Sequence, residues 1–148
     1  AGRTTEPAYL AQVQSAIREA GAGDRVRFLG VQSQEQMRLQ YREAELVVLS
    51  SREEVSPMSA IEALASGIPV ITTRAGGAGY IVDDGVTGRV VPPADPEAFA
   101  AALREVLCDP AGYAAMSAAA RPVAARRFRL DRVVDAYLAA YAAARENA

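Results

Sequence analysis

Two glutamates, Glu54 and Glu62, are separated by seven residues within the segment SSREEVSPMSAIEALASG, which runs from Ser50 to Gly67. Carboxylates accept hydrogen bonds from hydroxyl groups, such as the two that a ribose carries. If a helix begins between the two glutamates, its unpaired N–H groups and its partial positive charge favour a phosphate. The segment therefore has the chemistry to bind a ligand with both hydroxyl and phosphate groups.

A short helix from about Pro57 to Ser66 is expected to position these groups. Ser56 suits its N-cap and Pro57 its first turn, while Gly67 can end it in the left-handed conformation. The polar residues of the helix share one face, namely Ser59, Glu62 and Ser66. The apolar residues share the other, namely Ile61, Leu64 and Ala65. Taken without its context, a helical glutamate such as Glu62 is usually a solvated surface residue.

The elements around this helix follow an alternating pattern. Four short apolar runs have the character of buried parallel strands: Val26 to Gly30, Leu46 to Leu49, Pro69 to Thr72 and Arg89 to Val91. Between the first two lies a helical segment, Ser33 to Ala44, with Ser33 as its N-cap. Strands that alternate with helices predict a doubly wound α/β fold with a parallel sheet. In such a sheet, ligands bind beyond the carboxyl ends of the strands, where the helix with Glu62 begins.

The chain of 148 residues is expected to form one domain, with 51% apolar and 23% charged residues. The parallel α/β part covers about residues 1–93, and Ala-rich helices follow over about residues 95–146. Three helices are expected there: Asp95 to Leu107, Pro110 to about Phe128, and Leu130 to Arg145. Pro122 lies inside the second and is expected to kink or end it.

Composition excludes several classes of function. The absence of histidine excludes catalytic triads with an imidazole base and histidine-ligated metal sites, and no metal is expected. Cys108, the only cysteine, falls in an apolar helical stretch and is expected to be a buried thiol. A net charge of −2 argues against nucleic-acid binding. Because no signal peptide or membrane-spanning run is seen, we expect a cytoplasmic protein.

An ordered set of motifs surrounds the two glutamates. Upstream stand Asp24-Arg25-Val26-Arg27-Phe28-Leu29-Gly30, Tyr41 and Ala44; downstream stand Ala63-Leu64-Ala65-Ser66-Gly67-Ile68-Pro69-Val70, Gly76-Gly77, Asp84-Gly85-Val86-Thr87-Gly88 and Pro92. With the E-x(7)-E spacing, the set resembles the nucleotide-sugar-binding C-terminal domain of retaining GT-B glycosyltransferases of the family-four type. The resemblance covers essentially the whole chain. It implies a Rossmann-like domain that binds a nucleoside diphosphate sugar as donor, with no cofactor.

The resemblance also implies residue roles. Glu62 would bind the ribose hydroxyls and Glu54 the transferred sugar, so Glu54 is the candidate catalytic residue. The main chain around the helix start would hold the diphosphate and sugar, through Ser56, Pro57, Met58 and Ser59, although Pro57 has no N–H. The backbone of Leu29, Gly30 and Val31 would contact the base. Gly76 and Gly77 would form a loop close to the donor, although glycines there could equally be ordinary turn residues.

Two departures from the family pattern affect these expectations. Tyr80 stands near a position where the family commonly has a glutamate. The basic pair that clamps the diphosphate in the family would lie upstream of Ala1, together with the acceptor-binding N-terminal domain. The reaction that the resemblance implies is transfer of a sugar from the nucleoside diphosphate to an acceptor, with retained configuration. The main task in such a reaction is to stabilise charge on the leaving diphosphate, and losing one preorganised donor typically costs about 3 kcal/mol. The chain alone is therefore expected to turn over very slowly.

Three other functions compete with a transferase. A nucleotide-binding module without transferase activity and a fragment of a GT-B sugar epimerase share the expected architecture. A dehydrogenase-type dinucleotide fold is disfavoured, because no G-x-G-x-x-G follows a strand.

The family's sheet has the strand order 3-2-1-4-5-6, and the four apolar runs would be its strands 3, 4, 5 and 6. Ala1-Gly2 would be the end of the connection leaving strand 2. Without strands 1 and 2, the runs Val26 to Gly30 and Leu46 to Leu49 each have an unpaired edge. We expect that these two runs pair directly, that two copies of the chain associate through the edges, or that the missing segment stays attached as a separate piece.

Overall fold

The computed structural model describes residues 6–146, and these divide into two compact units after Gln40. The larger unit, from Tyr41 onward, contains all the strands and every buried residue among those described. The smaller unit contains helical and extended segments only. Because the positions of the two units relative to each other are not determined, each is described by itself.

The larger unit is built on a three-stranded parallel sheet with the order β1-β2-β3. The strands are β1 (Val47–Leu49), β2 (Val70–Thr73) and β3 (Gly88–Val91). They confirm three of the four predicted runs to within one residue at either end. Since all three strands are parallel, their carboxyl ends lie at one edge of the sheet.

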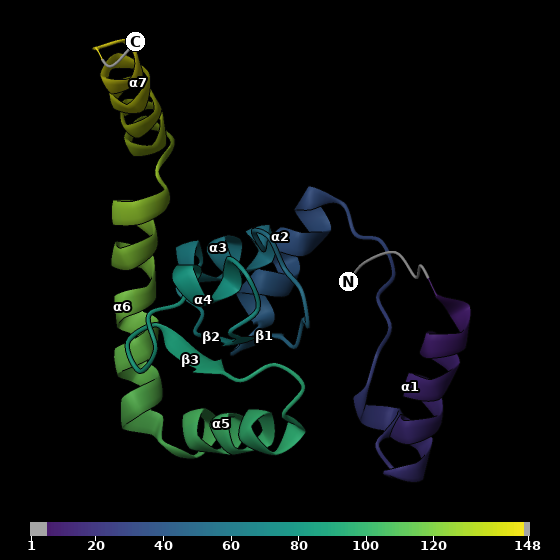
Figure 1. Cartoon of the computed structure of the whole chain (residues 1–148). Helices are drawn as coiled ribbons and strands as arrows, with labels where there is room; N and C mark the ends of the chain where they lie inside the picture. Colours follow the sequence, from purple (N-terminus) through teal and green to yellow (C-terminus); the bar gives the residue numbers. More distant parts are fainter. Residues whose placement is uncertain (1–5, 147–148) are drawn as a thin grey trace. The chain divides into compact units, whose positions relative to one another are not determined.

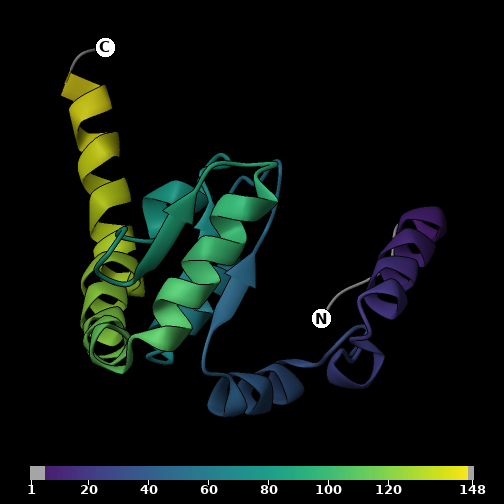
Figure 2. The ribbon, with the colours of Figure 1, turned by 90° about the horizontal axis from the view of Figure 1, so that it is seen from below.

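Helices cover both faces of this sheet, as a doubly wound fold requires (Figures 1 and 2). Side chains along the central strand β2 alternate, so Val70 joins one core cluster and Ile71 the other. The first cluster lies under α3 (Met58–Ala65) and α4 (Ala78–Ile81), and the second under α5 (Pro96–Cys108). Every residue of β2 is buried, which explains why its sequence is continuously apolar or small.

The C-terminal part is helical, as predicted. It comprises α5, α6 (Pro110–Phe128) and α7 (Leu130–Glu146). Pro122 does not end α6, so that alternative is wrong: Ala120 and Ala124, which flank it, are buried in the cluster that α6 shares with α3. Packing on both sides of Pro122 offsets the one backbone hydrogen bond that a proline removes. Cys108 is exposed rather than buried, because it is the last residue of α5.

The smaller unit contains α1 (Pro7–Glu19), the single turn η1 (Gly23–Arg25) and the start of α2 (Gln34–Glu43). The N-cap prediction for α2 is confirmed: the Ser33 hydroxyl accepts from the Gln36 N–H at 3.2 Å, and the Gln36 side chain accepts from the Ser33 N–H at 2.8 Å. α1 was not anticipated from the sequence.

The predicted strand from Val26 to Gly30 is wrong for the described structure. Among residues 6–146, the run is not part of any sheet, and residues 27–32 donate no backbone–backbone hydrogen bond to another described residue. An extended run becomes a strand only when a neighbour pairs with its N–H and C=O groups. The expected direct pairing with Leu46 to Leu49 stays a prediction, because the two runs belong to different units; within the larger unit, β1 pairs with β2. Ala1-Gly2, which we expected to end the connection leaving strand 2, lies outside the described residues.

β1 and β3 are the edge strands of the described sheet. Association of two copies through an open edge therefore stays a prediction, as does attachment of a separate segment. Light scattering at several concentrations, combined with the intact mass of the purified chain, separates these two outcomes from a plain monomer.

Candidate functional site

Two loops meet at the edge of the sheet where β1 and β2 end. The first joins β1 to α3 and contains Glu54, and the second joins β2 to α4 and contains Gly76 and Gly77. The Thr73 hydroxyl donates to the Ser51 carbonyl at 2.5 Å, and the Gly77 N–H donates to the Glu54 carbonyl at 3.0 Å. These two hydrogen bonds connect the loops, so the position of Glu54 depends on the second loop as well as on its own.

Gly76 and Gly77 allow the two loops to approach at backbone distance. A Cβ added to Gly76 would lie 3.0 Å from the Glu54 carbonyl carbon and closer still to its oxygen. A Cβ on Gly77 would meet the Val55 carbonyl in the same way, 3.1 Å from its carbon. Gly76 also has a φ of 51°, which favours glycine. The pair is therefore more than a turn: it supports the main chain that carries Glu54.

The helix that carries Glu62, α3, begins at Met58. The predicted N-cap, Ser56, is wrong: Pro57 occupies that position with extended backbone, and no side chain caps the helix. Ser56 falls one residue outside because the fixed φ of Pro57 already sets the entry into the helix. The N–H groups of Met58 and Ser59 precede the first intrahelical bond, so both can bind an anion placed at the sheet edge.

The opposite end of α3 is anchored by α6. The Ser117 hydroxyl donates to the Gly67 carbonyl at 2.8 Å, and the Arg121 guanidinium donates to the Ser66 carbonyl at 3.3 Å. Gly67 takes the predicted left-handed conformation, with a φ of 83°. The helix is therefore held at its C-terminus and along its length, whereas its N-terminus carries no capping side chain.

The buried face of α3 differs in part from the predicted one. Ala60, Ala63 and Leu64 are buried, Ile61 is half-buried, and Ala65 is exposed, so the prediction for Ala65 is wrong. The close approach of α6 accounts for the difference, because its Ala120 and Ala124 share the core cluster with Ala60, Ala63 and Leu64.

Glu62 lies on the exposed side of α3, and its carboxylate is held by a residue that sequence reasoning did not assign to the site. The Tyr41 hydroxyl donates to Glu62 Oε2 at 2.9 Å. Burial raises the pKa of the Tyr41 hydroxyl above its usual range, and the hydrogen bond to Glu62 and its negative charge raise this pKa further. Tyr41 was matched to the family's motif set, but no role was predicted for it. The phenol oxygen of a half-buried tyrosine, which needs a partner, is the signal that could have found one.

Three of the predicted site residues lie in the smaller unit, apart from the loops described above in the sequence. Leu29, Gly30 and Val31 belong to the smaller unit, and the Gln32 amide donates to the carbonyls of Leu29 at 2.5 Å and Val31 at 3.3 Å. Their predicted contact with a base therefore stays a prediction. Tyr80, near the family's glutamate position, is exposed and adds no carboxylate.

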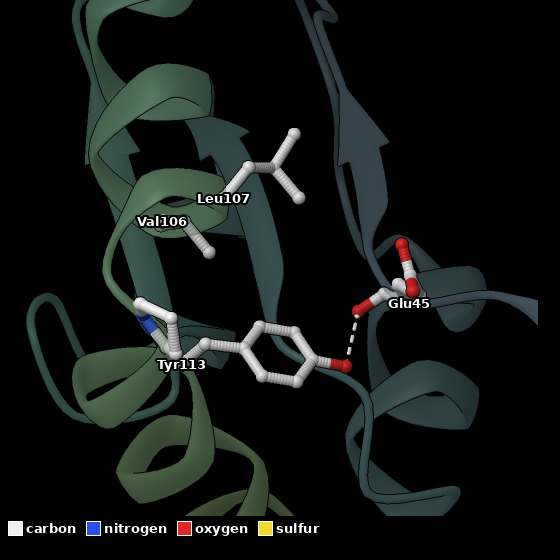
Figure 3. Close-up of a pocket in the computed structure, with 5 residues that line it drawn as sticks. Glu45, Val106, Leu107 and Tyr113 are labelled. Atoms are coloured by element: carbon white, nitrogen blue, oxygen red, sulfur yellow. Dashed lines mark hydrogen bonds between the residues drawn. The ribbon is translucent and has the colours of Figure 1, made fainter.

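A cavity of about 180 Å³ lies in the larger unit, away from these loops. It is lined by Glu45, Val106, Leu107, Pro110 and Tyr113, and Figure 3 shows the Tyr113 hydroxyl reaching the Glu45 main-chain oxygen, at 2.9 Å. Glu45 precedes β1, so the cavity lies at the amino end of that strand. Ligand pockets usually measure roughly 300–1,000 Å³ and carry several convergent polar groups. This cavity is small and mostly apolar, so the carboxyl edge remains the candidate site.

Two further observations concern the described residues alone. No helix within residues 6–146 is long and apolar enough to cross a membrane. The same residues hold no group of three or more cysteine, aspartate or glutamate side chains arranged for a metal ion. Donor binding without a metal stays a prediction.

The parallel sheet with helices on both faces, with a glutamate-bearing loop and helix at its carboxyl edge, defines a Rossmann-like domain of the GT-B type. The Anabaena protein HepE, solved in complex with UDP, has this fold: the TM-score is 0.86 over 96% of this chain and 39% of that chain, at 24% identity. Sucrose-phosphate synthase from Thermosynechococcus elongatus gives a TM-score of 0.81 over 96% of this chain and 38% of its own, at 30% identity.

Sequence comparison identifies the family. Residues 1–123 match the sequence model described as "Glycosyl transferases group 1", and the chain belongs to this family. The D-inositol 3-phosphate glycosyltransferase of Salinispora tropica is 38% identical over 135 residues, which are 91% of this chain and 27% of the relative. The enzyme of the same name from Mycolicibacterium smegmatis is 41% identical over 139 residues, 91% of this chain and 31% of the relative. The chain thus spans less than a third of the length of these curated relatives.

Proposed function

We propose that this chain binds the nucleoside diphosphate sugar donor of a retaining glycosyltransferase. The observation that carries the proposal is the meeting of two loops at the carboxyl edge of the sheet, with Glu54 on one of them and Glu62 on the helix that follows. Membership in the group 1 glycosyl transferases supports it. In the whole transferase, the domain would present the donor sugar to an acceptor bound elsewhere.

Glu62 is proposed to accept hydrogen bonds from the ribose hydroxyls. Its carboxylate is exposed, so the loss of hydration on binding is modest, and a charged acceptor strengthens each bond. A carboxylate repels a phosphate, and this favours the ribose over the diphosphate at this position. The diphosphate is then left for the N-terminus of α3 at Met58, about one helical turn away from Glu62.

The N–H groups of Met58 and Ser59 are proposed to stabilise the charge that grows on the leaving diphosphate. The helix dipole adds to their effect, and both are in place before the reaction begins. Each preorganised donor of this kind typically contributes about 3 kcal/mol to the transition state. Such stabilisation needs neither a histidine nor a metal ion.

Glu54 is proposed to contact the transferred sugar. Its main chain is fixed by the Gly77 N–H and packed against Gly76, so the side chain starts from a defined position. Because it precedes the helix, its loss is expected to weaken binding of the nucleotide sugar and to leave the free nucleotide unaffected.

The proposal is tested by calorimetry on the 148-residue chain with nucleoside diphosphates and their sugar conjugates. UDP is the first probe because HepE was solved with it, and ADP and GDP complete the set. Glu62→Gln keeps the size of the side chain, and we expect it to weaken the preferred nucleotide by about 1.5–3 kcal/mol. Glu54→Ala is expected to weaken only the nucleotide sugar. Unchanged nucleotide affinity in a folded Glu62→Gln variant, or no binding of any diphosphate by the parent chain, would refute the proposal.

A further inference from the structure

Tyr41 and Glu62 are 21 residues apart in the sequence, and the hydrogen bond between them joins α2 to α3. Tyr41 lies in the last turn of α2, and its ring packs against the core cluster beneath α3. Its hydroxyl emerges from this packing and donates to Glu62 Oε2 at 2.9 Å. The tyrosine is thus anchored at its ring, and the glutamate is held at one of its two oxygens.

An exposed glutamate on a helix samples several rotamers, and fixing it on binding costs up to about 2 kcal/mol of side-chain entropy. A hydrogen bond from an anchored tyrosine restricts those rotamers before a ligand arrives. Oε1 of Glu62 has no hydrogen-bond partner among residues 6–146. It therefore stays available to accept from a ligand while Oε2 is occupied.

The Tyr41 hydroxyl keeps its proton under physiological conditions. Burial is the main reason that its pKa lies above the usual range for tyrosine, and the neighbouring carboxylate acts in the same direction. The phenol therefore donates to Glu62 throughout the neutral range. No other side chain of the described residues donates to this carboxylate. The nearby Ser66 hydroxyl donates to the Glu62 main-chain oxygen instead.

We infer that Tyr41 is a positioning residue for nucleotide binding, which holds Glu62 so that Oε1 faces the ribose hydroxyls of a nucleoside diphosphate. The inference rests on the proposed function of Glu62. Tyr41 itself need not touch the ligand: it acts by holding the carboxylate in one orientation. The pair lies near the surface, where a hydrogen bond adds little to stability, so its main effect is expected on binding.

The test compares Tyr41→Phe with Tyr113→Phe in the full 148-residue chain. Both variants keep the ring and remove one hydroxyl that donates at 2.9 Å, but the Tyr113 hydroxyl bonds to the Glu45 carbonyl at the opposite edge of the sheet. Calorimetry with UDP and with its 2′,3′-dideoxy analogue separates an effect on ribose recognition from a general loss of structure. If ADP or GDP binds the parent chain more tightly, that nucleotide and its dideoxy analogue are used.

We expect Tyr41→Phe to weaken the ribonucleotide about fivefold to tenfold. The dideoxy analogue should bind equally to Tyr41→Phe and to the parent chain, and Tyr113→Phe should bind both ligands as the parent does. In a Glu62→Gln background, Tyr41→Phe should have no further effect, because the two residues act as one unit.

Two results would overturn the inference while leaving the proposed function intact. In one, Glu62→Gln weakens the ribonucleotide selectively but Tyr41→Phe does not. In the other, Tyr41→Phe weakens the ribonucleotide and its dideoxy analogue equally, which is the effect of a structural residue. If Glu62→Gln itself has no effect, the proposed function fails, and the inference fails with it.

Discussion

Two apolar runs of similar length adopt different structures in this chain. Val26 to Gly30 and Pro69 to Thr72 both suggest buried strands, yet only the second contributes one, β2. Phe28 in the first run is 54% exposed, whereas Ile71 in the second is fully buried. β2 has a hydrogen-bonded strand on each side and helices over both faces, and the first run has neither within its own unit. Apolar composition makes a segment capable of forming a strand, and partners decide whether it does.

The same contrast extends to the two units. Residues 41–146 surround two core clusters, whereas no residue from 6 to 40 is buried. Stability scales with the apolar area removed from water, so the larger unit is expected to supply nearly all the cooperative unfolding free energy. Paired substitutions, one in each unit, can confirm or refute this difference.

The largest expected effect is that of Leu64→Ala. Leu64 is fully buried on the core-facing side of α3, so removing its side chain leaves a cavity and should reduce the free energy of unfolding by about 3 kcal/mol. Phe28→Ala removes a larger side chain from an exposed position and should change this free energy by less than about 0.5 kcal/mol. Urea denaturation followed by circular dichroism measures both. A loss for Phe28→Ala as large as that for Leu64→Ala would show that the first run is buried in the folded protein.

A smaller effect is expected for Gly76→Ala. The new Cβ would collide with the Glu54 carbonyl, and the positive φ adds strain of about 1 kcal/mol. Together these should lower stability by about 2 kcal/mol and weaken the nucleotide sugar, because the Glu54 loop must move. Gly21→Ala is the matched control: Gly21 has a φ of 61° but nothing within contact distance, so strain alone remains. Thermal denaturation and calorimetry with UDP-glucose report on the two effects, and equal behaviour of both variants would contradict the supporting role of Gly76.

The smallest effect concerns helix caps. The Asp95 carboxylate accepts from the Ala98 N–H at 2.9 Å at the start of α5, which packs on the sheet, so Asp95→Ala should cost about 1 kcal/mol. Ser33→Ala removes the corresponding cap from α2, whose first turn belongs to the smaller unit. Its loss should increase local opening of that turn, with little change in the cooperative transition. Hydrogen exchange at the Gln36 and Ala98 amides reports local opening of each helix start, and urea denaturation reports the global free energy of unfolding. A clear shift of the urea transition by Ser33→Ala would indicate that the two units unfold together.

Local patterns allowed much of the fold to be predicted. Apolar runs located β1, β2 and β3, and Ser33 and Gly67 marked helix ends. The ordered set of motifs around the two glutamates led to the family that the comparisons identify. These features depend on residues close together in the sequence. Backbone sterics, capping hydrogen bonds and side-chain periodicity act over one to two helical turns, so the order of residues alone carries them.

Tertiary structure alone decided the remaining features, because each depends on residues distant in the sequence. The absence of a paired strand beside Val26 to Gly30 within its own described unit could not be predicted from the run itself. The approach of Gly76 to the Glu54 carbonyl requires two loops at one sheet edge, and the hydrogen bond from Tyr41 to Glu62 requires two helices in contact. The sequence supplied the two carboxylates and their spacing, whereas packing determined which groups hold them, since hydrogen bonds between distant segments form only when the core brings those segments together.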